Sequence, residues 1–249
     1  YSNISSKLSK FLIPILFCIF LLGIVLSGNR MPFLLFVLLI SLILIFQKET
    51  RKYFLPFVII FTILFSVIFS INQTVKINFK SFYGSVSNIT KSIINKEFSN
   101  ETTPQYLKEF ATFYDTWLMN KYIGGGIKNF RYYCHVRPNI DKSSGFICNM
   151  HPHNYYLEIL TETGLLGFIV ISISFLNVLY VSFYKKYFQN NSLNKNNMIT
   201  PFIFLFFVEI FPLKSTGSFF TTGVSTYIFL ILGILIGLLR VDNSIENKN

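Results

Sequence analysis

The chain has 249 residues, of which 52% are hydrophobic, with 30 Phe and 14 Tyr, and its mean hydropathy is +0.51. This apolar share excludes an ordinary soluble globular domain and places the chain in a lipid bilayer. The formal net charge is +11. We interpret the basic residues as markers of membrane orientation and expect no nucleic-acid partner.

The apolar residues fall in separate blocks, each near the roughly 20 residues needed to cross a hydrocarbon core of about 30 Å. Backbone groups inside lipid need partners within their own segment or in a closed barrel, and the blocks lack the alternating polar positions of barrel strands. The sequence therefore predicts an all-α polytopic membrane bundle with six transmembrane helices, at 11–27, 31–47, 54–71, 156–183, 199–213 and 223–239.

Lys7 and Lys10 precede the first block as in a signal peptide, but no small-residue cleavage pattern follows, so we expect a membrane helix there. The chain begins at Tyr1 rather than Met and enters the membrane almost at once. We therefore expect further helices before it in the complete protein.

Nine basic residues outside the long loop fall on one side if the six helices alternate, and the positive-inside rule makes that side cytoplasmic. They are Lys7, Lys10, Lys48, Arg51, Lys52, Lys185, Lys186, Lys195 and Arg240. The long loop is also basic, but long loops translocate largely regardless of charge. The expected organisation is three helices in 1–71, a periplasmic loop over 72–155, three helices in 156–240 and a cytoplasmic tail at 241–249.

Within the long loop, the first part is polar with scattered apolar residues, whereas apolar residues recur at helical spacing around 104–120. The second pattern predicts an amphipathic helix that lies on the membrane surface or, as we favour, packs against the bundle. Three glycines follow in YIGGGIKNFRYYC, 122–134. Glycine tolerates positive φ, which suits a tight loop against a ligand phosphate and equally a plain hinge.

Cys134 and Cys148 lie in the same loop with 13 residues between them. In an oxidising compartment this pair favours a disulfide, which would contribute roughly 3 kcal/mol by closing a loop of about 15 residues. The alternative is a metal site that also uses His135, His151 and His153. Because the spacing matches no zinc pattern, we favour the disulfide and expect no metal.

Residues 151–167 read HPHNYYLEILTETGLLG and place His153 and Asn154 directly before an apolar helix. Asn is a preferred N-terminal cap, and a capped helix start would hold the imidazole at the membrane boundary. Further along, Glu158 and Glu162 lie four residues apart in the first turns, where the helix dipole favours anions. Gly164 and Gly167 form a small patch suited to close helix packing.

Several cations are expected on the same periplasmic face. Arg30 in SGNRMPF either snorkels to the interface or binds a lipid-linked diphosphate through its guanidinium fork. Lys214, Arg131 and Arg137 are placed to assist. A histidine can take a proton from a hydroxyl, and fixed cations can stabilise a departing diphosphate, so the set suits group transfer from a lipid diphosphate carrier.

The run from His153 to Gly167 has His-Asn, nine residues, then Gly-x-x-Gly, and resembles the signature of the O-antigen ligase and polymerase superfamily. SGNR, GGGIKNFRYYC and FPLKSTGSFFTTG agree in order, and the resemblance covers about residues 10–240. It implies a GT-C-like glycosyltransferase of the bacterial inner membrane that needs no metal or other cofactor. Such an enzyme moves a glycan from undecaprenyl diphosphate to an acceptor at the periplasmic face.

Carried onto this chain, the resemblance makes His153 the residue that activates the acceptor hydroxyl and Arg30 a ligand of the donor diphosphate, with Lys214 and Arg131 beside it. His151, Asn154 and Glu158 would support them. Asn29 stands where the family often has Ser. The acceptor is lipid A core for a ligase, a growing glycan for a polymerase, or a protein hydroxyl for an oligosaccharyltransferase.

Two other classes compete with this hypothesis. A permease or flippase for a lipid-linked or anionic substrate would carry broken helices and charges near the bilayer midplane, and Glu209 is the one charge that approaches a membrane interior. A structural scaffold would explain the helices but not the gathering of His, Arg and Lys on one side.

Overall fold

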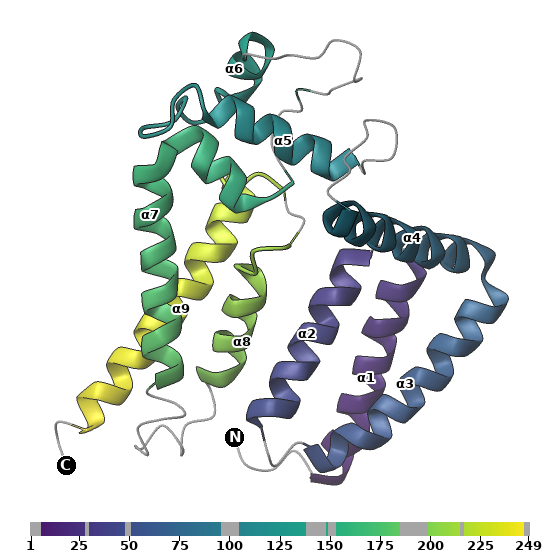
Figure 1. The fold of residues 1–249 in the computed structure, drawn as a ribbon. Coiled ribbons are helices and arrows are strands. Elements are labelled where there is room, and N and C mark those ends of the chain that lie inside the picture. The colour runs from purple at the N-terminus through teal and green to yellow at the C-terminus, as the bar shows by residue number, and fades with distance from the viewer. Residues whose placement is uncertain are drawn as a thin grey trace. The chain divides into compact units, whose positions relative to one another are not determined.

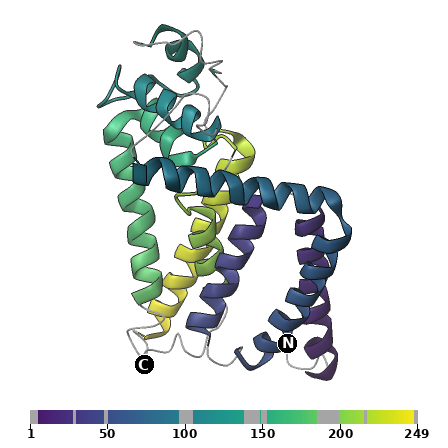
Figure 2. The ribbon, with the colours of Figure 1, turned by 45° about the vertical axis from the view of Figure 1, so that its right-hand side comes forward.

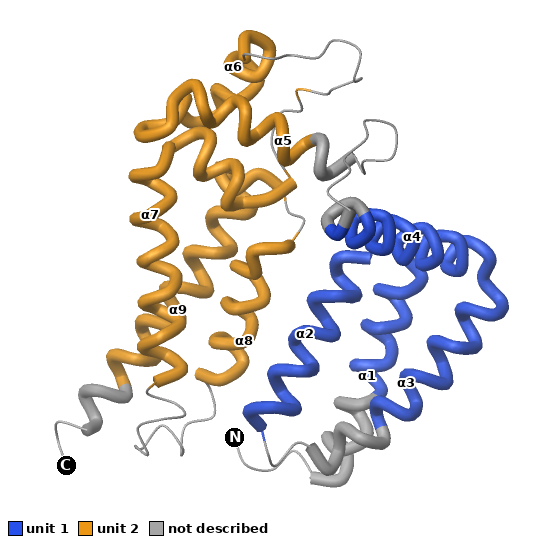
Figure 3. Tube along the Cα trace, viewed as in Figure 1, with its two compact units in different colours: residues 1–98 blue, residues 99–249 orange. Residues whose placement is uncertain are grey.

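The computed structural model describes residues 6–27, 30–47, 51–95, 105–137, 148, 153–184, 199–214 and 217–246. Every regular element within these ranges is a helix. The chain divides into two compact units, Tyr1–Phe98 and Ser99–Asn249 (Figure 3).

The first unit contains helices α1 (Ser6–Leu26), α2 (Arg30–Phe46), α3 (Arg51–Ile71) and α4 (Gln73–Asn95). The first three lie side by side, and α4 crosses one end of them (Figures 1 and 2). Aromatic rings fill the space between helices, as where the Phe17 ring lies 5.8 Å from that of Phe36 and 5.7 Å from that of Phe57. Such pairs contribute about 0.5–1.5 kcal/mol each beyond area burial, so this Phe-rich sequence holds the unit together.

The second unit contains α5 (Gln105–Trp117), α6 (Phe130–Val136), α7 (Tyr155–Phe183), α8 (Ile199–Glu209) and α9 (Thr222–Glu246). Helices α7, α8 and α9 pack together through apolar side chains such as Phe175, whose ring centroid lies 5.6 Å from that of Phe206. Helix α5, within the stretch where the sequence predicted an amphipathic helix, packs over the start of α7 (Figure 1).

Each of the six apolar blocks coincides with a helix, which makes the chain a membrane helical protein in composition and architecture. Among the described residues, two helices are long and apolar enough to cross a bilayer, Tyr155–Phe183 and Thr222–Val241. The bent pair Phe57–Ile71 and Gln73–Lys91 makes a third if it counts as one span. The count of six spans and the GT-C fold stay predictions.

Candidate functional site

Helix α7 begins with a short helix, residues 155–163, that is separated from the rest by a break at Gly164. Gly164 has φ 67° and ψ −170°, a backbone conformation essentially restricted to glycine. The helix is kinked at this residue. Figure 1 shows that the two parts of α7 run in different directions. The remaining 19 residues, 165–183, extend over roughly 28 Å and match a hydrocarbon core by themselves. The helix predicted over 156–183 is therefore present, with a break that the sequence analysis did not include.

The break is held by the glycine-rich loop. The N–H groups of Gly125 and Gly126 donate to the carbonyls of Thr161 (3.0 Å) and Glu162 (2.9 Å). In return, the N–H groups of residues 165 and 166 donate to the carbonyls of residues 121 and 122, at 2.9 and 3.1 Å. We call residues 121–126 and 161–166, joined in this way, the glycine clasp.

Two glycines make this close approach between the backbones feasible. A Cβ on Gly124, which has φ 73°, would collide with the backbone of Glu162 and Gly164. A Cβ on Gly164 would likewise collide with the backbone of Tyr122 and Gly124. The sequence analysis gave Gly164 a packing role against another helix, but its close neighbour is this loop. The Gly-Gly-Gly run was expected to form either a phosphate-binding loop or a hinge, and the structure shows a third arrangement, in which its backbone contacts residues 161–166.

Asn154 fixes the start of the short helix. Its side-chain Oδ1 accepts hydrogen bonds from the N–H groups of Tyr156 (3.0 Å) and Leu157 (3.2 Å), which confirms the predicted N-terminal cap. Its Nδ2 donates to the carbonyl of Pro212 at 2.6 Å, so one buried side chain links the helix start to the turn after α8. His153 directly precedes this cap and is exposed. The imidazole is therefore presented at the surface from a fixed backbone position.

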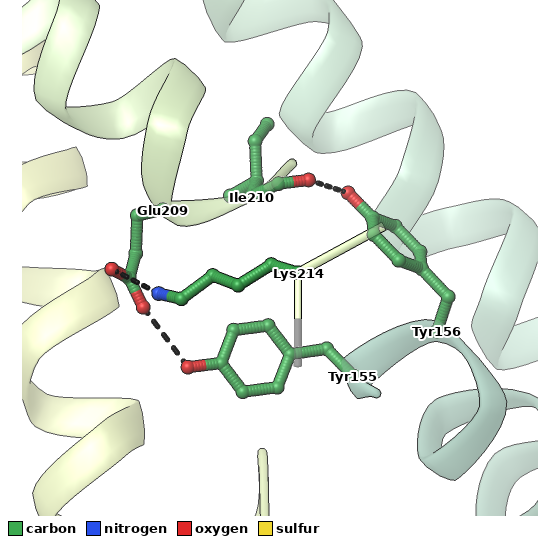
Figure 4. Close-up of polar contacts among 5 residues, drawn as sticks. All are labelled: Tyr155, Tyr156, Glu209, Ile210 and Lys214. Atoms are coloured by element: carbon green, nitrogen blue, oxygen red, sulfur yellow. Dashed lines mark hydrogen bonds and ion pairs between the residues drawn. The ribbon is translucent and has the colours of Figure 1, made fainter. Parts of the chain in front are cut away.

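The first turn of the short helix also contacts an ion pair (Figure 4). Lys214 Nζ lies 2.6 Å from Glu209 Oε2, and both side chains are mostly buried, with 15% and 12% exposed. The Tyr155 hydroxyl donates to Glu209 Oε1 at 2.9 Å, and Lys214 Nζ lies 5.6 Å from the centre of the Tyr155 ring. Beside them, the Tyr156 hydroxyl donates to the Ile210 carbonyl at 2.5 Å. The Lys214 charge is thus balanced by Glu209.

Glu158 binds the loop before α9. Its carboxylate is 1% exposed and accepts hydrogen bonds from the Ser218 hydroxyl (2.5 Å) and from the N–H of Phe219. Glu162, one turn later, is also buried, at 2%. The sequence interpretation of these glutamates as helix-dipole partners missed the role of Glu158 as a bridge to the loop over 210–221.

Cys134 and Cys148, the pair for which a disulfide was expected, are joined by one in the structure. Both thiols of the alternative metal site are used in this bond. Cys134 packs with Phe113 of α5 and Phe130 of α6, and Leu157 of the short helix contacts the same cluster. The disulfide therefore connects the loop before His153 to the elements that cover the short helix.

The loop arginines occupy two different environments. Arg137 is buried and donates to the Cys134 carbonyl at 2.5 Å. Burial lowers the pKa of its guanidinium, against the opposing field of Asp115. Arg131 is exposed on α6.

The predicted site residues fall into three groups. His153, Asn154, Glu158 and Lys214 lie on segments that the structure joins directly, through the bonds of Asn154 to Pro212 and of Glu158 to Ser218. Arg30 belongs to the first unit, where its Cζ lies 5.9 Å from the centre of the Phe82 ring. His151 lies outside the described residues. Tyr155 and Tyr156 were missed; the signal in the sequence is their place directly after the predicted cap, together with the acidic Glu209 in an apolar block.

Residues 15–172 match the sequence profile of a protein family described as O-antigen ligase. This match covers more than half of the chain and includes segments of both units. Comparisons with curated proteins and with solved structures gave no match.

Proposed function

The chain belongs to the O-antigen ligase family, and on this premise we propose that it transfers a glycan from undecaprenyl diphosphate to a sugar hydroxyl at the periplasmic face of the bacterial inner membrane. The family supports glycan transfer of the ligase or polymerase type in general. The observation that carries the finer proposal is the exposed His153, which stands directly before a helix start that is capped by Asn154 and tied to the Pro212 turn.

In the proposed reaction, the imidazole of His153 takes the proton of the acceptor hydroxyl. The hydroxyl oxygen then forms a bond to the anomeric carbon of the donor sugar, while the bond from that carbon to the diphosphate oxygen breaks. Undecaprenyl diphosphate leaves with the electron pair, and the imidazolium returns its proton to solvent or to the leaving group. General base catalysis of this kind typically contributes about 10²–10⁴ in rate.

The departing diphosphate gains negative charge and needs cations. We assign this role to Arg30, whose planar fork suits bidentate contact with phosphate, with Arg131 as a second ligand. Lys214 is paired with Glu209 and lies over the Tyr155 ring, so its charge is neutralised, and we assign it the role of holding the helix start beside the site. Asn154 and Glu158 position the short helix through their bonds to the loop over 210–221. For His151 the resemblance implies either a supporting role beside His153 or a place on the acceptor side, and we keep both.

The test is a His153→Ala variant of the full-length protein in cells, with His135→Ala as the matched control. His135 is also an exposed histidine of the second unit, on α6, and it has no role in the proposed reaction. We expect His153→Ala to abolish glycan transfer at normal protein level and His135→Ala to leave it unchanged. Normal polymer or capped lipopolysaccharide in His153→Ala cells would overturn the proposal.

The lipopolysaccharide banding pattern of a deletion strain identifies the acceptor. Loss of all O-antigen from the lipid A core indicates a ligase, and a single capped repeat indicates a polymerase. An unchanged pattern with loss of a glycoprotein indicates transfer to protein.

The permease alternative rested on Glu209, which forms an ion pair with Lys214 and accepts a hydrogen bond from Tyr155. Its carboxylate therefore has a structural use, and we do not propose transport as the function.

A further inference from the structure

Helix α4 is fixed across one end of the apolar helices of the first unit (Figures 1 and 2). It meets α3 at 103°, and Asn72 at the break accepts a hydrogen bond from the N–H of Val75 at 3.1 Å, as an N-terminal cap does. The ring of Phe79 lies 5.4 Å from that of Phe33 and 5.3 Å from that of Phe65. One side of α4 is thus packed on the helix ends, and its axis turns away from theirs.

The other side of α4 is basic. The helix contains Lys76, Lys80 and Lys91 and no acidic residue. Lys80 and Lys91 are exposed, and Lys76 is half-buried. At roughly 100° per residue, Lys80 and Lys91 lie opposite Phe82, the residue whose ring faces Arg30. These three lysines, which we call the lysine face, are therefore separate from the arginine proposed to bind the donor.

Large apolar side chains are exposed beside the lysine face: Ile77 at 58%, Tyr83 at 77% and Ile94 at 72%. A helix that exposes apolar residues next to lysines, at the level where apolar helices end, has the pattern of an amphipathic helix in the headgroup region. Tyr83 and Ile94, which at roughly 100° per residue lie on the flank between the packed side and Lys80, enter the acyl boundary, and the lysine stems extend to phosphates. We infer that the lysine face of α4 binds the headgroups of anionic phospholipids at the membrane surface.

Anionic phospholipid is favoured over a protein or glycan partner by two observations together. The three positive charges of α4 have no acidic residue on the same helix to balance them. The exposed apolar residues lie along the same helix, so the ligand must offer negative charge and hydrocarbon side by side, as a phospholipid does. This inference does not depend on the proposed glycosyl transfer, and lipid binding alone tests it.

The experiment uses the full-length protein in a neutral detergent, titrated with short-chain phosphatidylglycerol or with phosphatidylcholine of the same chain length. Amide hydrogen exchange over residues 73–95 reports binding at α4. We expect phosphatidylglycerol to slow exchange there, and expect each lysine replaced by glutamine to weaken binding about fivefold at low ionic strength. The triple variant Lys76→Gln, Lys80→Gln, Lys91→Gln should lose about 10² in affinity on the same scale.

The triple arginine variant at the same positions keeps the charge and should keep the affinity, and Lys121→Gln, an exposed lysine of the second unit, should have no effect. Rising salt should release the lipid from the unmodified protein, a measurement that needs no variant. The inference is overturned if phosphatidylcholine protects α4 equally, if the glutamine variant binds as tightly, or if inorganic phosphate alone gives the same protection. The last result would identify a phosphate site in place of a lipid surface.

Discussion

The glycine clasp makes a sharp prediction at Gly164. Alanine at this position would have to adopt φ 67° and ψ −170°, which costs about 1–3 kcal/mol for a residue with a Cβ. The new Cβ would also collide with the backbone of Tyr122 and Gly124. The loop must then move away, and the four hydrogen bonds of the clasp, each worth about 0.5–1.5 kcal/mol net, are weakened. We expect Gly164→Ala to lower the free energy of unfolding by about 3 kcal/mol or more.

The chain has one tryptophan, Trp117, whose indole N–H donates to the carbonyl of Lys121 at 2.9 Å, at the start of the clasp. Its fluorescence during heating therefore reports both the local contact and unfolding of the second unit. The matched control is Gly233→Ala in α9, where a Cβ would meet no atom within 4 Å and alanine favours the helix. If Gly164→Ala and the unmodified protein have the same melting temperature and the same Trp117 emission, the glycine clasp does not stabilise the break at Gly164.

Three further substitutions test the supports of the site. Cys148→Ser should lower the free energy of unfolding by about 3 kcal/mol, because it opens the loop to Cys134. Reduction of the unmodified protein should give the same shift in thermal unfolding, and equal melting of oxidised and reduced protein would contradict this. Glu209→Gln leaves the mostly buried Lys214 charge without its carboxylate and should lower the free energy of unfolding by about 2 kcal/mol. Tyr155→Phe removes only one hydrogen bond and should lower it by about 1 kcal/mol. Denaturant titration of both variants checks this order, and the reverse order would refute the ion-pair reading.

The positions of the apolar helices were predictable because hydropathy is a local property of the chain. Blocks such as 31–47 and 156–183 end within a few residues of α2 and α7. Helix α4 was missed although Val75, Phe79 and Phe82 recur on one helical side. The reason is that polar residues outnumber apolar ones in α4, so a search for long apolar blocks does not detect this amphipathic helix.

The site was predictable only in part, for a different physical reason. The cap at Asn154 depends on its own neighbours, and the sequence indicated it. The break at Gly164 depends on Gly124, 40 residues earlier, and no local pattern shows that two glycines will share one backbone contact. For the same reason, Lys214 was assigned to a ligand, while its contact with Glu209 was not foreseen.

A broken helix at the membrane boundary exposes backbone groups that lipid cannot satisfy, so it persists only where protein supplies their partners. Here the partners of residues 161–166 come from the glycine-rich loop, and the side-chain partners of Asn154 and Glu158 come from the loop over 210–221. The short helix that begins after His153 is therefore held at both of its ends by different parts of the second unit. A catalytic base needs such a fixed position more than it needs a long helix, since small displacements of a reacting group have large effects on rate. It follows that Gly164→Ala should reduce the rate of glycan transfer under conditions where the protein stays folded. An unchanged rate would show that the glycine clasp does not contribute to the reaction.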